Sequence, residues 1–140
     1  MKQLIIYTDG GCWPNPGGKG GAAALIIDGD EIIELKQGYE STTNNRMEIL
    51  SAILALESLA ENCQITLFSD SQYLVKTMNG QFGIHRNHDL WTRLGKAKKG
   101  HYVKFKWTPG HSSNWQNNRC DELALLARTE KLIEDGGYEK

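Results

Sequence analysis

Three apolar runs of strand length stand close together at the N-terminal end, and the connections between them are too short to hold a helix. The runs are QLIIYTD at 3–9, GGAAALIID at 20–28 and EIIELKQGYES at 31–41. Neighbouring strands with short connections are antiparallel, because a parallel pair needs a crossover of a dozen or more residues. This feature restricts the first third of the chain to an antiparallel meander.

A segment of helix length follows, and strand and helix patterns then alternate. NNRMEILSAILALESLAEN at 44–62 carries apolar residues around most of its circumference, so we expect a helix buried against the sheet. After it we predict a strand at 63–70, a short helix at 71–80 closed by glycine, a helix at about 88–99, a strand at 101–109 and a helix at 115–129. The order predicts an α/β fold with a mixed five-stranded sheet, three antiparallel strands and then two parallel ones, flanked by helices.

Length and composition favour one soluble globular domain. The chain has 140 residues, 39% of them hydrophobic and 24% charged, and no linker or repeat divides it. We assign residues 1–128 to this domain and 129–140 to a frayed C-terminal tail. The first apolar run is too short for a signal peptide or a membrane span, and the three cysteines form no C-x-x-C pair. We therefore expect reduced thiols and a cytoplasmic monomer without a membrane or protein partner.

The net charge of −1 conceals a basic segment. Residues 76–106 hold eight Lys or Arg against one acid. Such a segment is either a solvated helix face or a surface that follows phosphates. For the second interpretation, the candidate phosphate contacts are Lys96, Lys98 and Lys99.

Four carboxylates stand at the ends of predicted elements, and each has an ordinary structural explanation. Asp9 precedes a glycine and suits a turn, and Asp70 suits a helix N-cap. Glu48 completes a capping-box pattern, and Asp121 in an early helical turn complements the helix dipole. The competing hypothesis is that the four belong to one site.

The predicted topology supports the single site. If the strands that end in Asp9 and Asp70 are parallel neighbours, their carboxylates emerge side by side, about 4.8 Å apart. Glu48 at the start of the crossover helix then adds a third ligand. Carboxylates without a Cys or His cluster favour Mg²⁺, with Mn²⁺ as a substitute, and this spacing suits two ions roughly 3.5–4 Å apart. Together with the basic segment, the site predicts a phosphodiester hydrolase.

Five motifs in order now resemble the ribonuclease H type 1 family: TDGGCWPNPG, TTNNRMEI, SDSQYLV, TPGH and NNRCDELA. The resemblance runs from about Leu4 to Arg128. It implies a Mg²⁺-dependent endonuclease that cleaves the RNA strand of an RNA/DNA hybrid and leaves 3′-hydroxyl and 5′-phosphate ends. The family's catalytic carboxylates correspond to Asp9, Glu48, Asp70 and Asp121, and its assisting histidine corresponds to His111.

The loop after Asp9 agrees with this hypothesis. Its glycines let a sugar-phosphate chain come close without interference from Cβ atoms, and its two prolines stiffen it. A P-loop is excluded, because no Gly-Lys-Ser/Thr precedes a helix.

Polar residues near the acids are the candidates for substrate recognition. Amide side chains can contact the 2′-hydroxyl that distinguishes RNA from DNA, and the candidates are Asn15, Asn44, Asn45 and Gln72. The candidate phosphate contacts are Thr42, Thr43 and Arg46. The alternative is that Thr43, Asn44 and Asn45 only cap the helix.

One departure from the family concerns the segment KTMNGQFGIHRNHDL at 76–90, which leaves no room for the basic, tryptophan-bearing insertion of many bacterial relatives. We therefore expect weaker hybrid affinity, or a substitute grip from the basic segment. Two other classes stay open: a resolvase or transposase core, expected to lack the amide cluster, and a non-catalytic hybrid-binding module, expected to have lost an acid.

Overall fold

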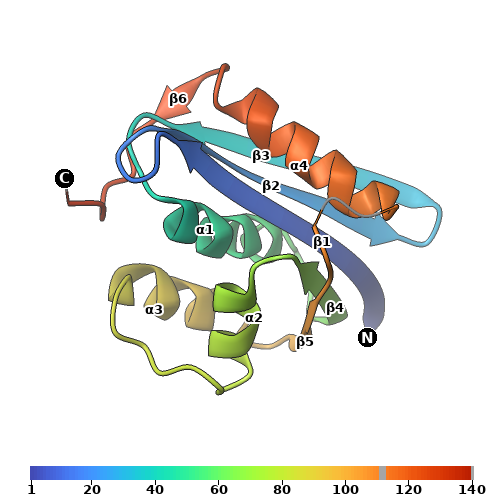
Figure 1. The fold of residues 1–140 in the computed structure, drawn as a ribbon. Coiled ribbons are helices and arrows are strands. Elements are labelled where there is room, and N and C mark those ends of the chain that lie inside the picture. The colour runs from blue at the N-terminus through green and yellow to red at the C-terminus, as the bar shows by residue number, and fades with distance from the viewer. Residues whose placement is uncertain (111–112, 140) are drawn as a thin grey trace.

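The computed structural model describes residues 1–110 and 113–139 of the chain. One sheet runs through the molecule in the strand order β5-β4-β1-β2-β3-β6 (Figure 1). The strands are β1 (Lys2–Trp13), β2 (Lys19–Asp28), β3 (Glu31–Tyr39), β4 (Cys63–Ser69), β5 (Tyr102–Trp107) and β6 (Leu132–Ile133). The helices are α1 (Asn44–Glu57), α2 (Gln72–Met78), α3 (His88–Ala97) and α4 (Trp115–Ala127).

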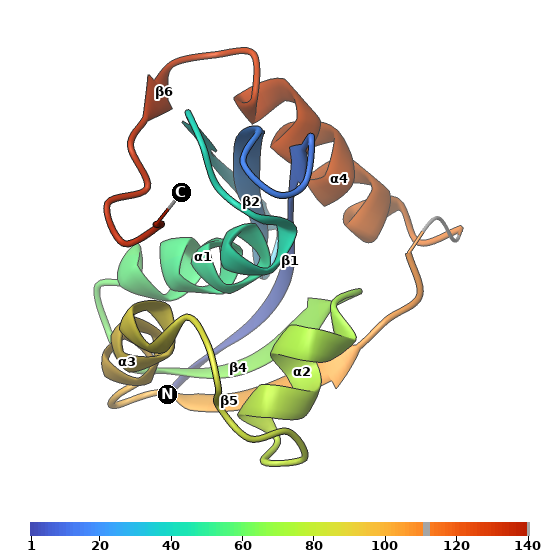
Figure 2. The ribbon, with the colours of Figure 1, turned by 60° about the vertical axis from the view of Figure 1, so that its left-hand side comes forward.

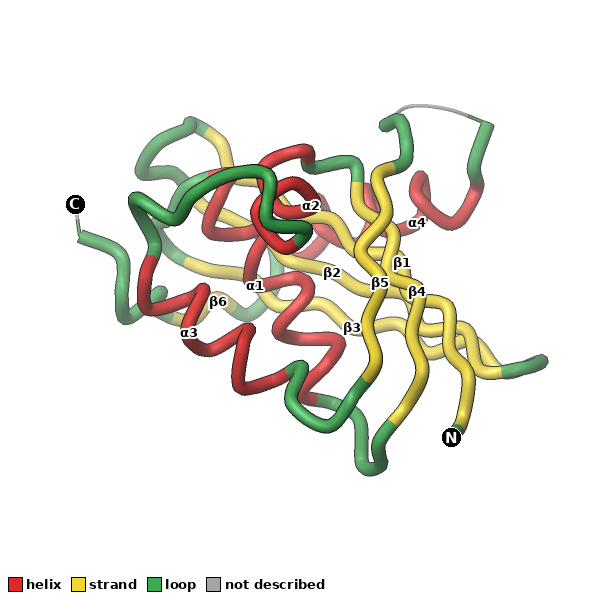
Figure 3. Tube along the Cα trace, turned by 90° about the horizontal axis from the view of Figure 1, so that it is seen from below, coloured by secondary structure: helices red, strands yellow, loops and turns green. Residues whose placement is uncertain are grey.

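The pairing confirms the predicted mixed α/β sheet. β1–β2 and β2–β3 are antiparallel, whereas β1–β4 and β4–β5 are parallel. Helix α1 is the crossover between β3 and β4 in sequence, and α3 lies against it (Figure 3). Within the described residues, no helix is long and apolar enough to cross a membrane.

The helices cover the sheet unequally. Helices α1, α2 and α3 pack on one face and α4 packs on the other (Figures 1 and 2). The larger core lies between the sheet and α1, where Ile6, Ile26, Ile53 and Leu67 are fully or almost fully buried. The burial of α1 around most of its surface agrees with its apolar sequence, because α3 covers the side that faces away from the sheet.

Two strand predictions were wrong in detail. The sheet has six strands, not five, because β6 pairs in parallel with β3 through Gly38↔Leu132 and Tyr39↔Ile133. The segment expected to be a frayed tail is therefore folded onto the sheet edge. A two-residue strand carries no periodic pattern, so only its long-range pairing reveals it.

β1 also continues past Asp9, which the sequence analysis placed at a strand end. Its parallel pairing with β4 stops at Thr8↔Ser69, but its antiparallel pairing with β2 continues to Trp13↔Lys19. The motif after Asp9 reads as a loop because it is rich in glycine. Tertiary pairing with β2 overrides that local preference.

Glycines in β2 and β3 let α4 lie close to the sheet. A Cβ atom on Gly21 would lie 2.0 Å from the carbonyl oxygen of Ala124, and one on Gly38 would lie 2.0 Å from that of Ala127. No side chain fits between these backbones. The glycines therefore determine how closely α4, which carries Asp121, approaches β2 and β3.

We predict that Gly21→Ala lowers the free energy of unfolding by about 1–3 kcal/mol, the range for overpacking a filled core. Gly95→Ala is the matched control, because it lies inside α3 with open space around the added Cβ. Alanine there should raise the free energy of unfolding by roughly 0.5–1 kcal/mol. Urea denaturation measures both; equal stabilities for the two variants would contradict the proposed close contact.

Candidate active site

Three carboxylates from three different elements meet at one end of the sheet. Asp9 comes from β1, Glu48 from α1, and Asp70 directly follows β4. One oxygen from each carboxylate lies within 4.8 Å of the corresponding oxygens of the other two. Asp9 and Glu48 are buried and Asp70 is partly exposed, so the cluster opens toward solvent on the Asp70 side.

Strand register and one glycine bring these acids together. The last parallel pair of β1 and β4 is Thr8↔Ser69, so the next residue on each strand is an aspartate. A Cβ atom on Gly10 would lie 2.4 Å from the carbonyl oxygen of Met47 and 2.9 Å from the amide nitrogen of Glu48. The missing side chain lets the first turns of α1 touch β1, which places Glu48 beside Asp9.

The helix caps lie on other residues than the acids. Thr43 caps α1 by accepting a hydrogen bond from the Arg46 amide at 3.1 Å, and Ser71 caps α2 by accepting one from the Leu74 amide at 3.1 Å. The capping-box interpretation of Glu48 and the N-cap interpretation of Asp70 are therefore wrong. Both side chains are free of these structural tasks.

Burial and mutual repulsion perturb all three carboxylates. Burial, followed by the charges of Asp70 and Asp121, raises the pKa of Asp9 to about 8. Burial and the charge of Asp9 hold the pKa of Glu48 well above its usual value, and burial also raises the pKa of Asp70. Glu48 Oε1 is buried without a hydrogen-bond partner. These oxygens fit a cation, which would supply the missing partner and relieve the repulsion.

Asp121 joins the cluster from the opposite side of the sheet. It lies in the second turn of α4, not the first, so the helix-dipole interpretation is wrong. The neighbouring Cys120 Sγ donates to the Tyr7 carbonyl oxygen at 3.2 Å and holds α4 against β1. Asp121 then lines a cleft of about 110 Å³ together with Asp9 and Asn44.

Of the predicted amide residues, Asn44 lines this cleft, and Asn15 is joined to Asn44 by hydrogen bonds between their segments; we call these two residues the rim amides. Asn44 Oδ1 accepts from the Cys12 amide at 2.7 Å, and Asn15 Oδ1 accepts from the Asn44 amide at 3.0 Å. Both residues are exposed, and their NH₂ groups are left for a ligand by these two bonds. Asn45 is exposed next to Asn44, and Gln72 is exposed on the first turn of α2, two residues after Asp70.

Other predicted contacts are internal or distant. Thr42 and Arg46 are buried, and the Arg46 guanidinium is bound to acids within the fold. The turn that contains Lys98 and Lys99 packs beside the start of β4, where His101 Nδ1 accepts from the Cys63 amide at 3.0 Å. Lys96 is in the last turn of α3 nearby. The three lysines are thus separated from the acids by the length of β4.

The sequence analysis missed the residues that support Asp70. Trp107 Nε1 donates to the Asp70 carbonyl oxygen at 3.2 Å, and a Cβ atom on Gly110 would lie 2.7 Å from Asp70 Oδ2. Both residues lie in or next to the TPGH motif, from which only the histidine was selected as a candidate. His111 itself lies outside the described residues. In the described part of the chain, no helix stands in place of the basic insertion of many bacterial relatives. Residues 79–87, which join α2 to α3, form a loop.

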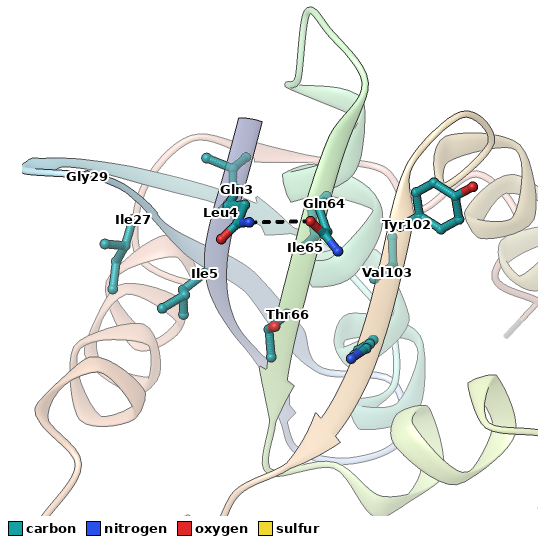
Figure 4. A pocket seen from close by; sticks show the side chains of 11 residues that line it. Gln3, Leu4, Ile5, Ile27, Gly29, Gln64, Ile65, Thr66, Tyr102 and Val103 are labelled. Atoms are coloured by element: carbon teal, nitrogen blue, oxygen red, sulfur yellow. Dashed lines mark hydrogen bonds between the residues drawn. The ribbon is translucent and has the colours of Figure 1, made fainter. Parts of the chain in front are cut away.

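A groove with a volume of about 620 Å³ lies away from the acidic site, over the first halves of β1, β4 and β5 (Figure 4). Gln3 and Gln64 face each other there with Nε2 to Oε1 at 3.5 Å, and Tyr102 lies at its side (Figure 4). No carboxylate lines it.

A mixed sheet with acids clustered where the parallel pairing of two strands stops suits the metal-assisted phosphodiester chemistry of one class of nucleases. Similarity to known proteins identifies the family. The RNase H family model matches residues 1–129, and the chain belongs to the RNase H family.

Two curated relatives are named ribonuclease H. The protein from Syntrophus aciditrophicus is 45% identical, with 99% of this chain and 88% of the relative covered. The protein from Citrobacter koseri is 42% identical, with 99% and 97% covered. The crystal structure of LC11-RNase H1 in complex with an RNA/DNA hybrid is 26% identical, with a TM-score of 0.76 over 90% of this chain and 96% of that one.

We predict that Asp9→Asn stabilises the protein in metal-free buffer, and more so at pH 8 than at pH 5. The pKa of Asp9 is about 8 in the folded chain against an ordinary value of 3.8, so the folded state binds more protons across that window. The wild-type free energy of unfolding therefore falls as pH rises from about 4 to about 8, and the Asn variant escapes this loss. Melting temperatures in EDTA should differ by a few degrees at pH 8. A difference that shrinks toward pH 8 would contradict the assignment.

Proposed function

We propose that this protein is an endoribonuclease that hydrolyses the RNA strand of RNA/DNA hybrids and leaves 3′-hydroxyl and 5′-phosphate ends. The observation that carries the proposal is the convergence of the Asp9, Glu48 and Asp70 carboxylates to within 4.8 Å in a chain of the RNase H family. The relatives named ribonuclease H and the hybrid-bound LC11-RNase H1 structure support it. Its action as a cytoplasmic monomer stays a prediction.

Asp9, Glu48, Asp70 and Asp121 are the residues proposed to hold two divalent ions, Mg²⁺ by preference and Mn²⁺ as a substitute. Bound Mg²⁺ would supply Lewis-acid activation of water and stabilise charge on the leaving 3′-oxygen. The carboxylates must be ionised to bind, so the raised pKa values of Asp9 and Glu48 make ion binding release protons. The buried, partnerless Glu48 Oε1 supports an ion on that side of the cluster.

The rim residues are proposed to position the RNA strand. Asn44 lines the cleft with Asp9, and Asn15 is hydrogen-bonded to the Asn44 amide, so their NH₂ groups suit a 2′-hydroxyl or the minor-groove edges of bases. The exposed Asn45 and Gln72 are proposed as further contacts. Thr43 has its side-chain oxygen engaged as the helix cap, so its hydroxyl hydrogen is left for a phosphate. We do not include Thr42 and Arg46, because both are buried within the fold.

His111 stays the proposed proton-transfer residue or metal-release aid, with a role implied by family resemblance. Its imidazole suits both tasks near neutral pH.

We predict that Asp70→Asn reduces hybrid cleavage by roughly 10³-fold or more, because several kcal/mol of charge stabilisation is lost. Asp28→Asn is the control: Asp28 pairs with Lys2 on the surface and should leave turnover unchanged. Assays use an RNA/DNA hybrid, duplex DNA and duplex RNA with Mg²⁺. Cleavage of duplex DNA by the wild type would favour a resolvase-like nuclease, and no cleavage of any substrate would favour a binding module.

Replacing Lys96, Lys98 and Lys99 by Gln tests the remaining phosphate contacts. Their separation from the acids predicts an effect on long hybrids only, since β4 is seven residues, or roughly 23 Å, long. For such hybrids KM should rise, the slope of log affinity against log salt should flatten by at most about three units, and kcat should be unchanged. Unchanged KM at every length would leave these lysines as a solvated helix face.

A further inference from the structure

A buried arginine joins the C-terminal segment to the start of α1. Arg46 Nε donates to Asp135 Oδ2 at 2.7 Å and Nη2 donates to Asp135 Oδ1 at 2.9 Å, a bidentate pair. Both side chains are only 4% exposed. The other side of the guanidinium donates to Asp89 at 2.8 and 3.0 Å. Among these acids, only Asp135 accepts from Nε.

Residues 132–139, which we name the C-terminal strap, contact the edge of β3, the start of α1 with the turn before it, and the glycine-rich loop. β6 lies on the edge of β3, and the strap then turns back toward α1 (Figure 2). Thr42 Oγ1 donates to Asp135 Oδ2 at 2.8 Å. The hydroxyl of Tyr138 lies 3.8 Å from where a Gly17 Cβ would be.

The segment held by Asp135 carries groups of the active site. Arg46 is two residues before Glu48 and two after Asn44. The turn before it is tied to the glycine-rich loop, because Gly17 N donates to the Thr42 carbonyl oxygen at 2.8 Å and Thr42 N donates to that of Gly18 at 3.1 Å. Displacing this turn moves the glycine-rich loop and the first turns of α1 together.

We infer that Asp135 is a positioning residue for catalysis: through Arg46 it holds the first turns of α1, and so determines where Glu48 and Asn44 stand relative to Asp9. The inference rests on the proposed function where it concerns binding and cleavage of the hybrid. The strap then does more than cover a sheet edge, because the loss of Asp135 would leave the buried Arg46 guanidinium without part of its charge compensation. The exposed side of Asp89 cannot replace Asp135, since Asp89 already uses both oxygens on Arg46.

The strap offers a matched pair of glycine variants. A Cβ atom on Gly137 would lie 1.9 Å from Asp89 Oδ2 and 2.8 Å from Arg46 Nη2, so Gly137→Ala forces the strap or these two side chains to shift without removing any charge. Gly136→Ala adds the same methyl one residue earlier, where nothing lies within 4 Å. Asp135→Asn keeps the side-chain size and removes the charge.

The test measures Mg²⁺ binding by calorimetry without nucleic acid, the amide resonances of Asn44 and Glu48, and KM and kcat for the hybrid, all at a temperature where circular dichroism shows the variants folded. Asp135→Asn and Gly137→Ala should weaken Mg²⁺ binding by about 3- to 10-fold, below the 10–100-fold typical of groups bonded directly to a metal ligand. They should also shift both amides and raise KM, with kcat at saturating Mg²⁺ within about twofold of the wild type. Gly136→Ala should match the wild type in every measurement.

A lower melting temperature with unchanged Mg²⁺ affinity, amide shifts and KM would overturn the inference and leave the strap a stabilising element only. If Asp135→Asn does not fold, Gly137→Ala decides, since it retains every ion-pairing group. If the wild type fails to cleave the hybrid, the proposed function fails, but the calorimetric and resonance measurements still decide whether Asp135 positions Glu48.

Discussion

The parallel pairing of β1 with β4 is the contact on which the site depends. It ends at Thr8↔Ser69, and the next residue on each strand is an acid that has to share low-dielectric space with the other. Three nearby contacts hold the like charges together. Gly10 lets α1 lie close to β1, Cys120 bonds α4 to β1, and Trp107 bonds the backbone of Asp70. Protonation of Asp9, whose pKa burial and the neighbouring charges raise to about 8, relieves part of this repulsion. A bound cation would relieve it with the carboxylates ionised, so ion binding would also stabilise the fold.

Segments that are distant in the sequence support this arrangement of acids. Glu48 depends on where α1 begins, and that start is determined by Thr43 as cap, by the glycine-rich loop and by Arg46. Because Arg46 is bound on one side to α3 and on the other to the strap, distant parts of the chain converge on one helical turn. The rim amides Asn15 and Asn44 belong to the same turn and loop, so the proposed ion ligands and the proposed substrate contacts share one structural support.

What could be predicted from the sequence followed from patterns that are local or periodic. The meander, the buried α1 and the parallel β4 and β5 all carry such patterns, and the acids followed because parallel strands expose their carboxyl ends at one edge. The features that were not predicted depend on tertiary contacts. β1 extends past Asp9 because β2 pairs with it, Arg46 looked like a phosphate contact because its partner lies 89 residues away, and β6 has no pattern to detect. The distance between Lys96, Lys98, Lys99 and the acids could not be predicted either, because the sequence does not reveal that α3 ends near the start of β4.

The short β6 also affects whether strands of other chains can add to the edge of the sheet. Among the described residues, β6 pairs with β3 at Gly38 and Tyr39 alone, and β5 is the other edge strand of the sheet. Most of the β3 edge and the outer edge of β5 therefore have no strand partner in the described part of the chain. The open part of β3 carries exposed Glu31, Glu34 and Lys36, and β5 carries exposed Lys104 and Lys106. Charges on an edge oppose the addition of a foreign strand, because their burial would cost solvation. The buried Gly38–Tyr39 pair carries no charge, and this is the stretch of β3 with which β6 pairs.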